Sequence, residues 1–178
     1  MKEQLQKDFE NTIRNLSLSQ KDIEIKKFSL DNFINKGFPN RREEDWKFSD
    51  LNQIINKNIG ELSFYNDYTS TNKVDTSVFV DGLVHNKIVF INGRIEKIDF
   101  DYEKKDQIEI IDQSEIINKF ENNNSLSDLN SAFTNKSFKI VVKKGYQLSK
   151  PLIIYHTTNS KIWSKNINLR LDFELEED

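Results

Sequence analysis

Cysteine and histidine, two side chains that often serve as nucleophile and as general base, are scarce in this chain of 178 residues, which contains no cysteine and two histidines, His85 and His156. Disulfides, thiolate metal sites, a cysteine nucleophile and a histidine-rich metal site are therefore excluded within this sequence. Serine catalysis needs a histidine held beside the nucleophile and oriented by an acid. Neither histidine has such a motif around it, so we interpret both as polar residues on half-exposed strands.

Three carboxylates, Asp172, Glu174 and Glu176, alternate along one segment and would share one face of a strand. Such a row suggests a cation site or a pair of catalytic acids. However, paired catalytic acids normally come from different elements, and we interpret the row as the solvent-facing side of a strand. Glycine-rich phosphate-binding motifs are also absent from the sequence. We therefore predict a non-enzymatic chain, without catalytic, metal-binding or cofactor-binding residues.

The segment of residues 37–48 concentrates charge around Trp46, and Arg41 with Arg42 could clamp an anion there. Acids follow the two arginines directly, which favours a structural interpretation over an anion site. If the segment is helical, opposite charges lie four residues apart and can pair, namely Arg41 with Asp45 and Glu43 with Lys47. The structural prediction is thus a buried Trp46 among local ion pairs.

The composition indicates a folded protein and argues against nucleic acid and membranes as its partners. Hydrophobic residues make up 36% of the chain and charged residues 31%, and thirteen phenylalanines can supply a core. The net charge of −3, with no basic cluster, argues against nucleic acid as a partner. The sequence has no apolar run long enough to cross a membrane and no apolar leader at its N-terminus. We expect no membrane association and a cytoplasmic location.

The N-terminal part reads as helical. Leu5, Phe9, Ile13 and Leu16 mark one face of an amphipathic helix that we expect to dock on its own domain. A second, short helix is predicted to begin at a Ser29 cap and end at Gly37. A helical turn is predicted at residues 51–55, and a loop or weak strand at residues 60–76.

The middle of the chain mixes strands and helices. Residues 87–91 and 94–100 flank an Asn92-Gly93 pair, the signature of a hairpin with a type I′ turn. A short strand is predicted at residues 108–111 and a helix at residues 114–120. Residues 122–125 form a candidate linker, and a two-turn helix follows at residues 126–133, capped by Ser125 or Ser127.

Beyond Lys136 the sequence predicts strands at residues 138–143, 152–155 and 166–177. The last of these alternates apolar and polar residues through five apolar positions, from Ile167 to Leu175. It would leave a long apolar edge uncovered, so we expect the chain to be part of a longer reading frame.

Four motifs in sequence order resemble the SufB/SufD family of iron–sulfur cluster assembly proteins. They are GFPNRREEDWKFSDL at residues 37–51, VFINGR at 89–94, LNSAF at 129–133, and the strand at 138–145 followed by KPLII at 150–154. The basic pair followed by tryptophan is more similar to the SufD branch than to the SufB branch. The resemblance spans about residue 30 to the C-terminus.

The resemblance implies an α+β fold, with an N-terminal domain of helices and strands at residues 1–135. The first rungs of a right-handed parallel β-helix, truncated, would follow at residues 136–178. It also implies a scaffold of the SUF system that works with a SufB-like paralogue and a SufC-like ATPase. The family region that docks the ATPase, and the later cysteine and histidine positions implicated in cluster assembly, have no counterpart here. No cofactor is therefore expected in this chain.

Two alternatives remain open from the sequence. One is a stand-alone protein-interaction domain with Arg41, Arg42 and Trp46 on its binding surface. The other is a polysaccharide-acting enzyme built on a parallel β-helix, which would need clustered acids or basic residues from adjacent rungs and an export signal.

Overall fold

The structure, a computed structural model, describes residues 2–59, 62–65, 73–113, 124–159, 162 and 165–177. The chain packs as two compact units that interleave along the sequence. The first unit comprises Met1–Asn66, Ser114–Asn135 and Ser164–Leu169, and the second comprises Asp67–Gln113, Lys136–Trp163 and Arg170–Asp178. The predicted division into residues 1–135 and 136–178 stays a prediction.

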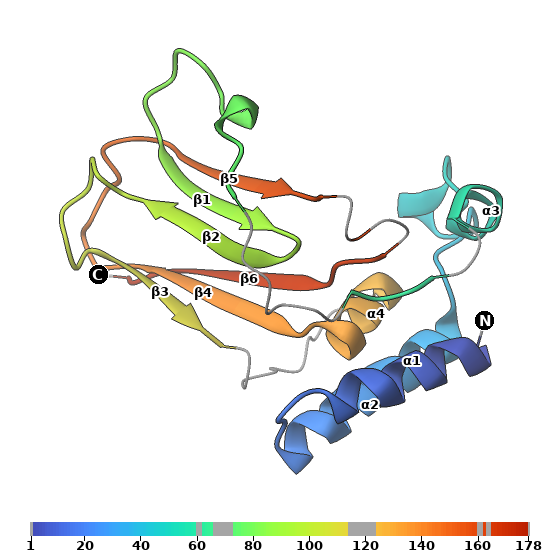
Figure 1. Cartoon of the computed structure of the whole chain (residues 1–178). Helices are drawn as coiled ribbons and strands as arrows, with labels where there is room; N and C mark the ends of the chain where they lie inside the picture. Colours follow the sequence, from blue (N-terminus) through green and yellow to red (C-terminus); the bar gives the residue numbers. More distant parts are fainter. Residues whose placement is uncertain are drawn as a thin grey trace. The chain divides into compact units, whose positions relative to one another are not determined.

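Helices dominate the first unit. They are α1 (Lys2–Arg14), α2 (Gln20–Lys36), α3 (Leu51–Ile54) and α4 (Ser125–Phe133), with a 3₁₀ turn η1 (Glu44–Trp46) before α3 and a π turn η2 (Ile55–Ile59) after it. Helices α1 and α2 lie side by side (Figure 1). The predicted helices at the N-terminus, at residues 51–55 and at residues 126–133 are confirmed.

Helix α2 begins earlier than predicted. Its N-cap is Ser19, whose hydroxyl oxygen accepts from the Asp22 amide at 3.2 Å. Ser29, the predicted cap, is buried inside the helix, so that prediction is wrong. The end is confirmed: Gly37 has φ 74°, and its N–H donates to the Phe33 carbonyl at 2.7 Å. A left-handed conformation of this kind is open to glycine at little cost.

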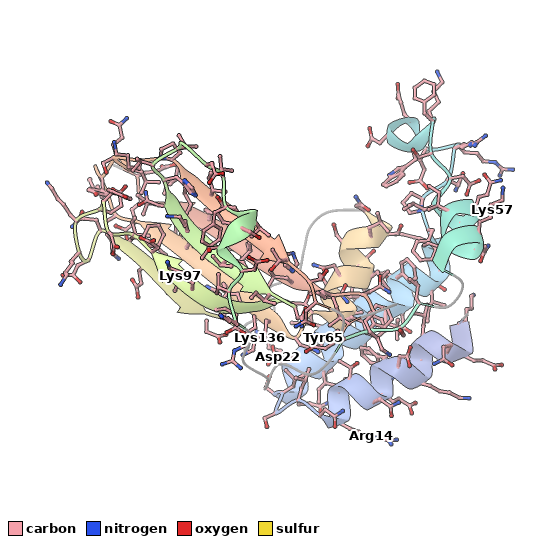
Figure 2. The ribbon with its side chains drawn as sticks, turned by 45° about the horizontal axis from the view of Figure 1, so that its top comes forward. Arg14, Asp22, Lys57, Tyr65, Lys97 and Lys136 are labelled. Atoms are coloured by element: carbon pink, nitrogen blue, oxygen red, sulfur yellow. The ribbon has the colours of Figure 1, made fainter. Side chains whose placement is uncertain are left out.

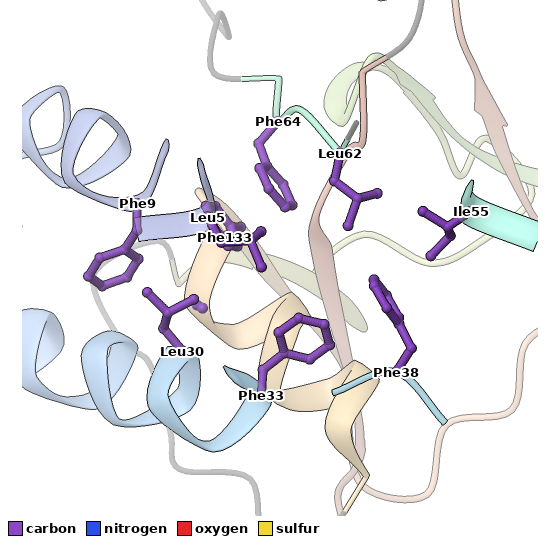
Figure 3. Close-up of a cluster of buried hydrophobic side chains, with 10 residues drawn as sticks. Leu5, Phe9, Leu30, Phe33, Phe38, Ile55, Leu62, Phe64 and Phe133 are labelled. Carbon is purple, nitrogen blue, oxygen red and sulfur yellow. The ribbon is translucent and has the colours of Figure 1, made fainter. Parts of the chain in front are cut away.

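The core of the first unit joins segments far apart in sequence (Figure 3). Phe133 of α4 stacks on Phe64 with a centroid distance of 3.6 Å and meets Phe9 of α1 edge-on at 6.1 Å. The other buried members of this cluster are Leu5, Leu30, Phe33, Phe38, Ile55, Leu62 and Ala132. Both last residues of the LNSAF motif, Ala132 and Phe133, are therefore explained by packing.

A lysine lies within this helical unit. Lys26 of α2 is 0% exposed, and its Nζ donates to carbonyl oxygens at the end of α4: Ser131 at 3.3 Å, Ala132 at 3.4 Å and Thr134 at 2.5 Å. These carbonyls have no partner inside their own helix, and a cation suits the negative end of its dipole. Burial lowers the pKa of Lys26 to about 8, and the charge of Asp22 opposes this shift.

The strands among the described residues form two sheets of three. The first has the order β2-β1-β5, with β1 (Asn86–Ile91), β2 (Arg94–Asp99) and β5 (Leu152–Thr157). The second has the order β3-β4-β6, with β3 (Ile108–Asp112), β4 (Lys136–Val142) and β6 (Leu169–Leu175). A 3₁₀ turn, η3 (Thr76–Val78), precedes β1. The strands predicted at these positions are confirmed.

The hairpin is confirmed in detail. Strands β1 and β2 pair antiparallel around Asn92 and Gly93, which have φ values of 53° and 79°. Two positive φ angles in succession are the mark of a type I′ turn, whose twist matches that of the flanking strands. The sequence motif VFINGR therefore corresponds to the end of β1 and its turn.

The predicted β-helix is wrong. β1 pairs antiparallel with β2 and parallel with β5, and β3 pairs antiparallel with β4. A parallel β-helix stacks one coil on the next in parallel, whereas the described strands make two small three-stranded sheets in which antiparallel pairs occur beside a parallel one. Alternation in the sequence indicates that a segment is a strand but does not select its partner.

Three further predictions concern the connection before α4. The predicted helix at residues 114–120 lies outside the described residues. So do residues 122 and 123 of the predicted linker at residues 122–125, whereas Ser125 is the first residue of α4. The cap of α4 is Asn124, whose side-chain oxygen accepts from the Leu126 amide at 2.9 Å, and not Ser125 or Ser127.

Candidate protein-interaction surface

The segment of residues 37–48 is anchored in the first unit at its start. Phe38 is 4% exposed and meets Phe33 edge-on at a centroid distance of 5.0 Å. Pro39 is also fully buried. This anchor fixes where the charged part of the segment leaves the core.

A local hydrogen-bond network holds the charged part in shape. Asn40 Oδ1 accepts from the Arg42 amide at 3.0 Å, and the Asn40 amide donates to Glu43 Oε1 at 3.1 Å. The Glu43 amide donates to the Asn40 carbonyl at 3.0 Å. Downstream, Asp50 caps α3 by accepting from the Gln53 amide at 3.0 Å. The segment is thus ordered by its own turn chemistry between two fixed ends.

The prediction of a buried Trp46 among ion pairs is wrong. Trp46 is only half-buried, and among the described residues neither predicted pair, Arg41 with Asp45 or Glu43 with Lys47, lies within ion-pair distance. The reason is the geometry of η1, a single 3₁₀ turn. With three residues per turn, positions four apart do not share one side as they do in an α-helix.

The outer side of the segment is exposed instead. Phe48 is 90% exposed, and Lys47 Nζ lies 5.7 Å from the centroid of its ring. Arg41 and Arg42 are exposed as well. Side chains project from the ribbon between α2 and α3 in Figure 2, next to the turns that carry the labelled Lys57. We call the exposed residues Arg41, Arg42 and Phe48, together with the half-buried Trp46 between them in sequence, the exposed aromatic–arginine cluster.

The residue types of this cluster suit it to binding another protein. Tryptophan and arginine are the residues most enriched at the energetic centres of protein interfaces. An aromatic side chain buries roughly 150–250 Å² when a partner covers it. The neighbouring acids Glu43, Glu44 and Asp45 are exposed too, so the segment presents both signs of charge.

The histidines lie in two different environments. His85 is 2% exposed and precedes β1, so its interpretation as a half-exposed strand residue is wrong. Its Nδ1 lies 2.6 Å from the Leu83 carbonyl oxygen and its Nε2 lies 2.7 Å from the Tyr155 hydroxyl. His156 is exposed on β5, and partial desolvation lowers its pKa. Among the described residues neither histidine meets a serine or a carboxylate in the way that nucleophilic catalysis requires.

The acidic row on β6 consists of ion-paired residues. Asp172 accepts from Arg170 Nε at 2.9 Å, and Glu174 pairs with Lys139 of β4. Glu176, just beyond β6, pairs with Lys143 at 3.1 Å. These contacts agree with the interpretation of the row as the solvent-facing side of a strand.

Within the part of the chain that the structure describes, no three histidine or acidic side chains gather closely enough to hold a metal ion. The absence of a cofactor therefore stays a prediction.

One polar cluster was not predicted from the sequence. The carboxylate of Glu103 accepts from Asn86 Nδ2 at 2.6 Å, from the Tyr146 hydroxyl at 2.6 Å, and from the amides of Ser149 and Lys150. Desolvation raises the pKa of Glu103, but these donors outweigh it and lower the pKa to about 2. The cluster connects segments that are distant in sequence. In the sequence, Glu103 is one acid in a charged turn, and nothing around it indicates that it binds these donors.

No protein-family model and no curated protein matches this chain. Of the described helices, none combines the length and the apolar composition that a bilayer crossing requires.

Proposed function

We propose that this chain is a non-enzymatic scaffold component of the SUF system for iron–sulfur cluster assembly, which acts by binding partner proteins. The observation that carries the binding role is the exposure of Phe48, at 90%, on a segment fixed by its own hydrogen bonds. The assignment to the SUF system is supported by the four motifs at residues 37–51, 89–94, 129–133 and 138–154.

The proposed partners are a SufB-like paralogue and a SufC-like ATPase in the cytoplasm. Two of the four motifs have a structural explanation in this chain: Ala132 and Phe133 fill the core, and Asn92 with Gly93 makes the hairpin turn. The exposed aromatic–arginine cluster has none. Residues that neither pack nor cap are the ones a partner can use.

Double replacement of Arg41 and Arg42 by alanine should abolish co-purification with the SufB-like paralogue. Recovery of the SufC-like ATPase is not the readout, because the family region that docks it has no counterpart in this chain. Both side chains are exposed, so the thermal midpoint of unfolding should stay within about 2 °C of the wild type. The test mixes the chain with purified SufB-like and SufC-like proteins from the same source and isolates it by affinity tag. Lys104→Ala combined with Lys105→Ala, in an exposed turn of the second unit, is the matched control and should leave recovery unchanged.

A wild-type chain that recovers neither partner would contradict the SUF assignment. A large drop in the thermal midpoint of the Arg41→Ala/Arg42→Ala variant would instead assign the arginines a structural role.

The second candidate function is a stand-alone protein-interaction domain outside the SUF system. The same exposed aromatic–arginine cluster favours it. Recovery of a different partner in place of the SufB-like and SufC-like proteins, lost again in the double-alanine variant, would support this alternative. The hypothesis of a polysaccharide-acting enzyme is no longer supported, because it required a parallel β-helix and the described residues do not form one.

A further inference from the structure

Strand β6 forms one edge of the sheet β3-β4-β6 and lies beside β4 (Figure 1). The Glu176 amide, just beyond the strand, donates to the Val142 carbonyl at 3.0 Å, so the backbone of this residue faces β4. Backbone groups of successive strand residues point to opposite sides, and those of Leu171, Phe173 and Leu175 therefore face away from β4. Among the described residues, β4 is the one strand that is hydrogen-bonded to β6. The side away from β4, here called the free edge, can accept one more strand.

The inner face of β6 is apolar and accessible at this edge. Phe173 and Leu175 are 54% and 71% exposed, although Ile140 on the neighbouring β4 is 1% exposed. Both residues border a cavity of about 260 Å³, which is lined by apolar side chains, among them Ile140 of β4 and Leu152 and Ile154 of β5. Side chains directly opposite each other on neighbouring strands lie on the same face of a sheet. A strand added to the free edge would therefore cover Phe173 and Leu175 with its own inward-pointing side chains.

The outer face of the sheet alternates in charge from strand to strand. Lys143, just beyond β4, pairs with Glu109 of β3 at 3.5 Å and with Glu176 at 3.1 Å. Lys139 of β4 pairs with Glu174 of β6. Acids of β3 and β6 thus flank the lysines of β4 on both sides. A strand beyond β6 continues this alternation when its outward-pointing residues are basic.

The ion pairs with β4 leave the carboxylates of β6 within reach of a second cation. The side chains of Glu174 and Glu176 are 47% and 36% exposed. Hydrogen bonds from the Lys144 amide and from Lys143 lower the pKa of Glu176, so it is ionised near neutral pH. Opposite charges on directly opposed strand residues stabilise the pair of strands, and like charges destabilise it. The free edge therefore favours a strand with basic residues opposite Glu174 and Glu176.

We propose that the free edge of β6 binds an extended segment of a partner protein in which basic residues alternate with apolar ones, added to the sheet as a further strand. A second copy of this chain matches the edge less well. Antiparallel pairing of two β6 strands around Phe173 sets Asp172 of each copy opposite Glu174 of the other. The inference goes beyond the proposed function and does not rest on it, because residues 170–175 belong to the second unit and the exposed aromatic–arginine cluster belongs to the first.

A labelled peptide of seven residues, the length of β6, tests the chemistry of the segment by fluorescence anisotropy at low ionic strength. The probe is Lys-Val-Lys-Val-Lys-Val-Lys with blocked termini, and the control peptide has glutamate in place of each lysine. The lysine peptide should bind with a dissociation constant below about 1 mM, and the glutamate peptide should bind at least about tenfold more weakly. N-methylation of alternate amides should abolish binding for the set that faces β6 and spare the other set, because the backbone of an added strand bonds along one side.

Two variants of the protein locate the binding site on β6. Leu175→Pro removes an N–H that faces the free edge and leaves the Glu176 bond to β4, so it should abolish binding of the lysine peptide. Glu174→Gln combined with Glu176→Gln should weaken binding of this peptide about fivefold. The matched control is Glu109→Gln combined with Asp112→Asn on β3, the opposite edge of the same sheet, and it should leave the affinity within about twofold.

If Leu175→Pro does not fold, Leu175→Ala serves instead and should weaken binding at least about threefold, since the side chain is largely exposed in the free chain. The N-methylated peptides give a result that needs no variant. Failure of the lysine peptide to bind, equal affinity for the lysine and glutamate peptides, or full affinity in a folded Leu175→Pro protein would overturn the proposal. Dimerisation of the wild type without peptide, lost in Leu175→Ala, would assign the edge to a second copy and overturn it as well.

Discussion

Phe133→Ala should lower the free energy of unfolding by about 3–5 kcal/mol, whereas Phe48→Ala should change it by less than about 0.5 kcal/mol. Phe133 is 1% exposed and Phe48 is 90% exposed, although both belong to motifs that resemble one family. Removal of the buried ring leaves a cavity between Phe64 and Phe9, on which it packs. Removal of the exposed ring of Phe48 leaves no cavity, because the ring is surrounded mainly by water.

Urea denaturation followed by circular dichroism measures both values under one set of conditions. A loss above about 1.5 kcal/mol in Phe48→Ala would mean that Phe48 packs on the protein, contrary to the exposed position described. A loss below about 1 kcal/mol in Phe133→Ala would contradict its place in the core of the first unit.

Lys26→Met should lower the free energy of unfolding by about 3 kcal/mol at neutral pH, because three carbonyls of Ser131, Ala132 and Thr134 lose their donor. Methionine keeps the length and the apolar stem of the side chain, so the cavity contribution stays small. Lys27→Met is the matched control. Lys27 is exposed on the same helix, and its replacement should cost less than about 0.5 kcal/mol.

The effect of Lys26→Met on the free energy of unfolding should also depend on pH. The pKa of Lys26 is lowered to about 8 in the folded state from 10.5. Above pH 8 the unfolded chain therefore holds a proton that the folded one has released, and this contribution to stability increases up to about pH 10.5. The difference in unfolding free energy between wild type and Lys26→Met should grow by about 1.4 kcal/mol per pH unit in this window. A difference that stays constant from neutral to alkaline pH would contradict the desolvation of Lys26.

Local patterns predicted the local structure well. Asn92-Gly93 specified its hairpin turn, Gly37 ended α2, and the spacing of Leu5 and Phe9 identified the buried face of α1. In each case the physical cause lies within a few residues of the signal. A positive φ angle, a missing Cβ atom or a helical repeat has its structural effect regardless of the rest of the chain.

Partners distant in sequence were not predictable in the same way. Ile88 of β1 pairs with Ile154 of β5, and no property of either residue selects the other. The β-helix was predicted from resemblance and strand periodicity, which specify neither the partner nor the direction of a strand. The Glu103 cluster and the bond between His85 and Tyr155 are likewise long-range.

One omission and one error had a usable signal in the sequence. Lys26 lies four and seven residues before Leu30 and Phe33, on the apolar face of α2, and a lysine at such a position suggests a buried partner. Pro39 and Asn40 begin a turn rather than a helix, so the ion pairs proposed for residues 41–47 depended on a periodicity that this stretch does not adopt.

The central claim is that the exposed aromatic–arginine cluster is a protein-binding surface. The most direct test is the dissociation constant for the purified SufB-like paralogue, measured by titration calorimetry for the wild type, Phe48→Ala and Tyr102→Ala. Tyr102 is 50% exposed in the second unit and is the control. Phe48→Ala should weaken binding by about tenfold or more, which corresponds to about 1.4 kcal/mol, and Tyr102→Ala should leave it within about twofold. Equal affinities for the wild type and Phe48→Ala would contradict the claim.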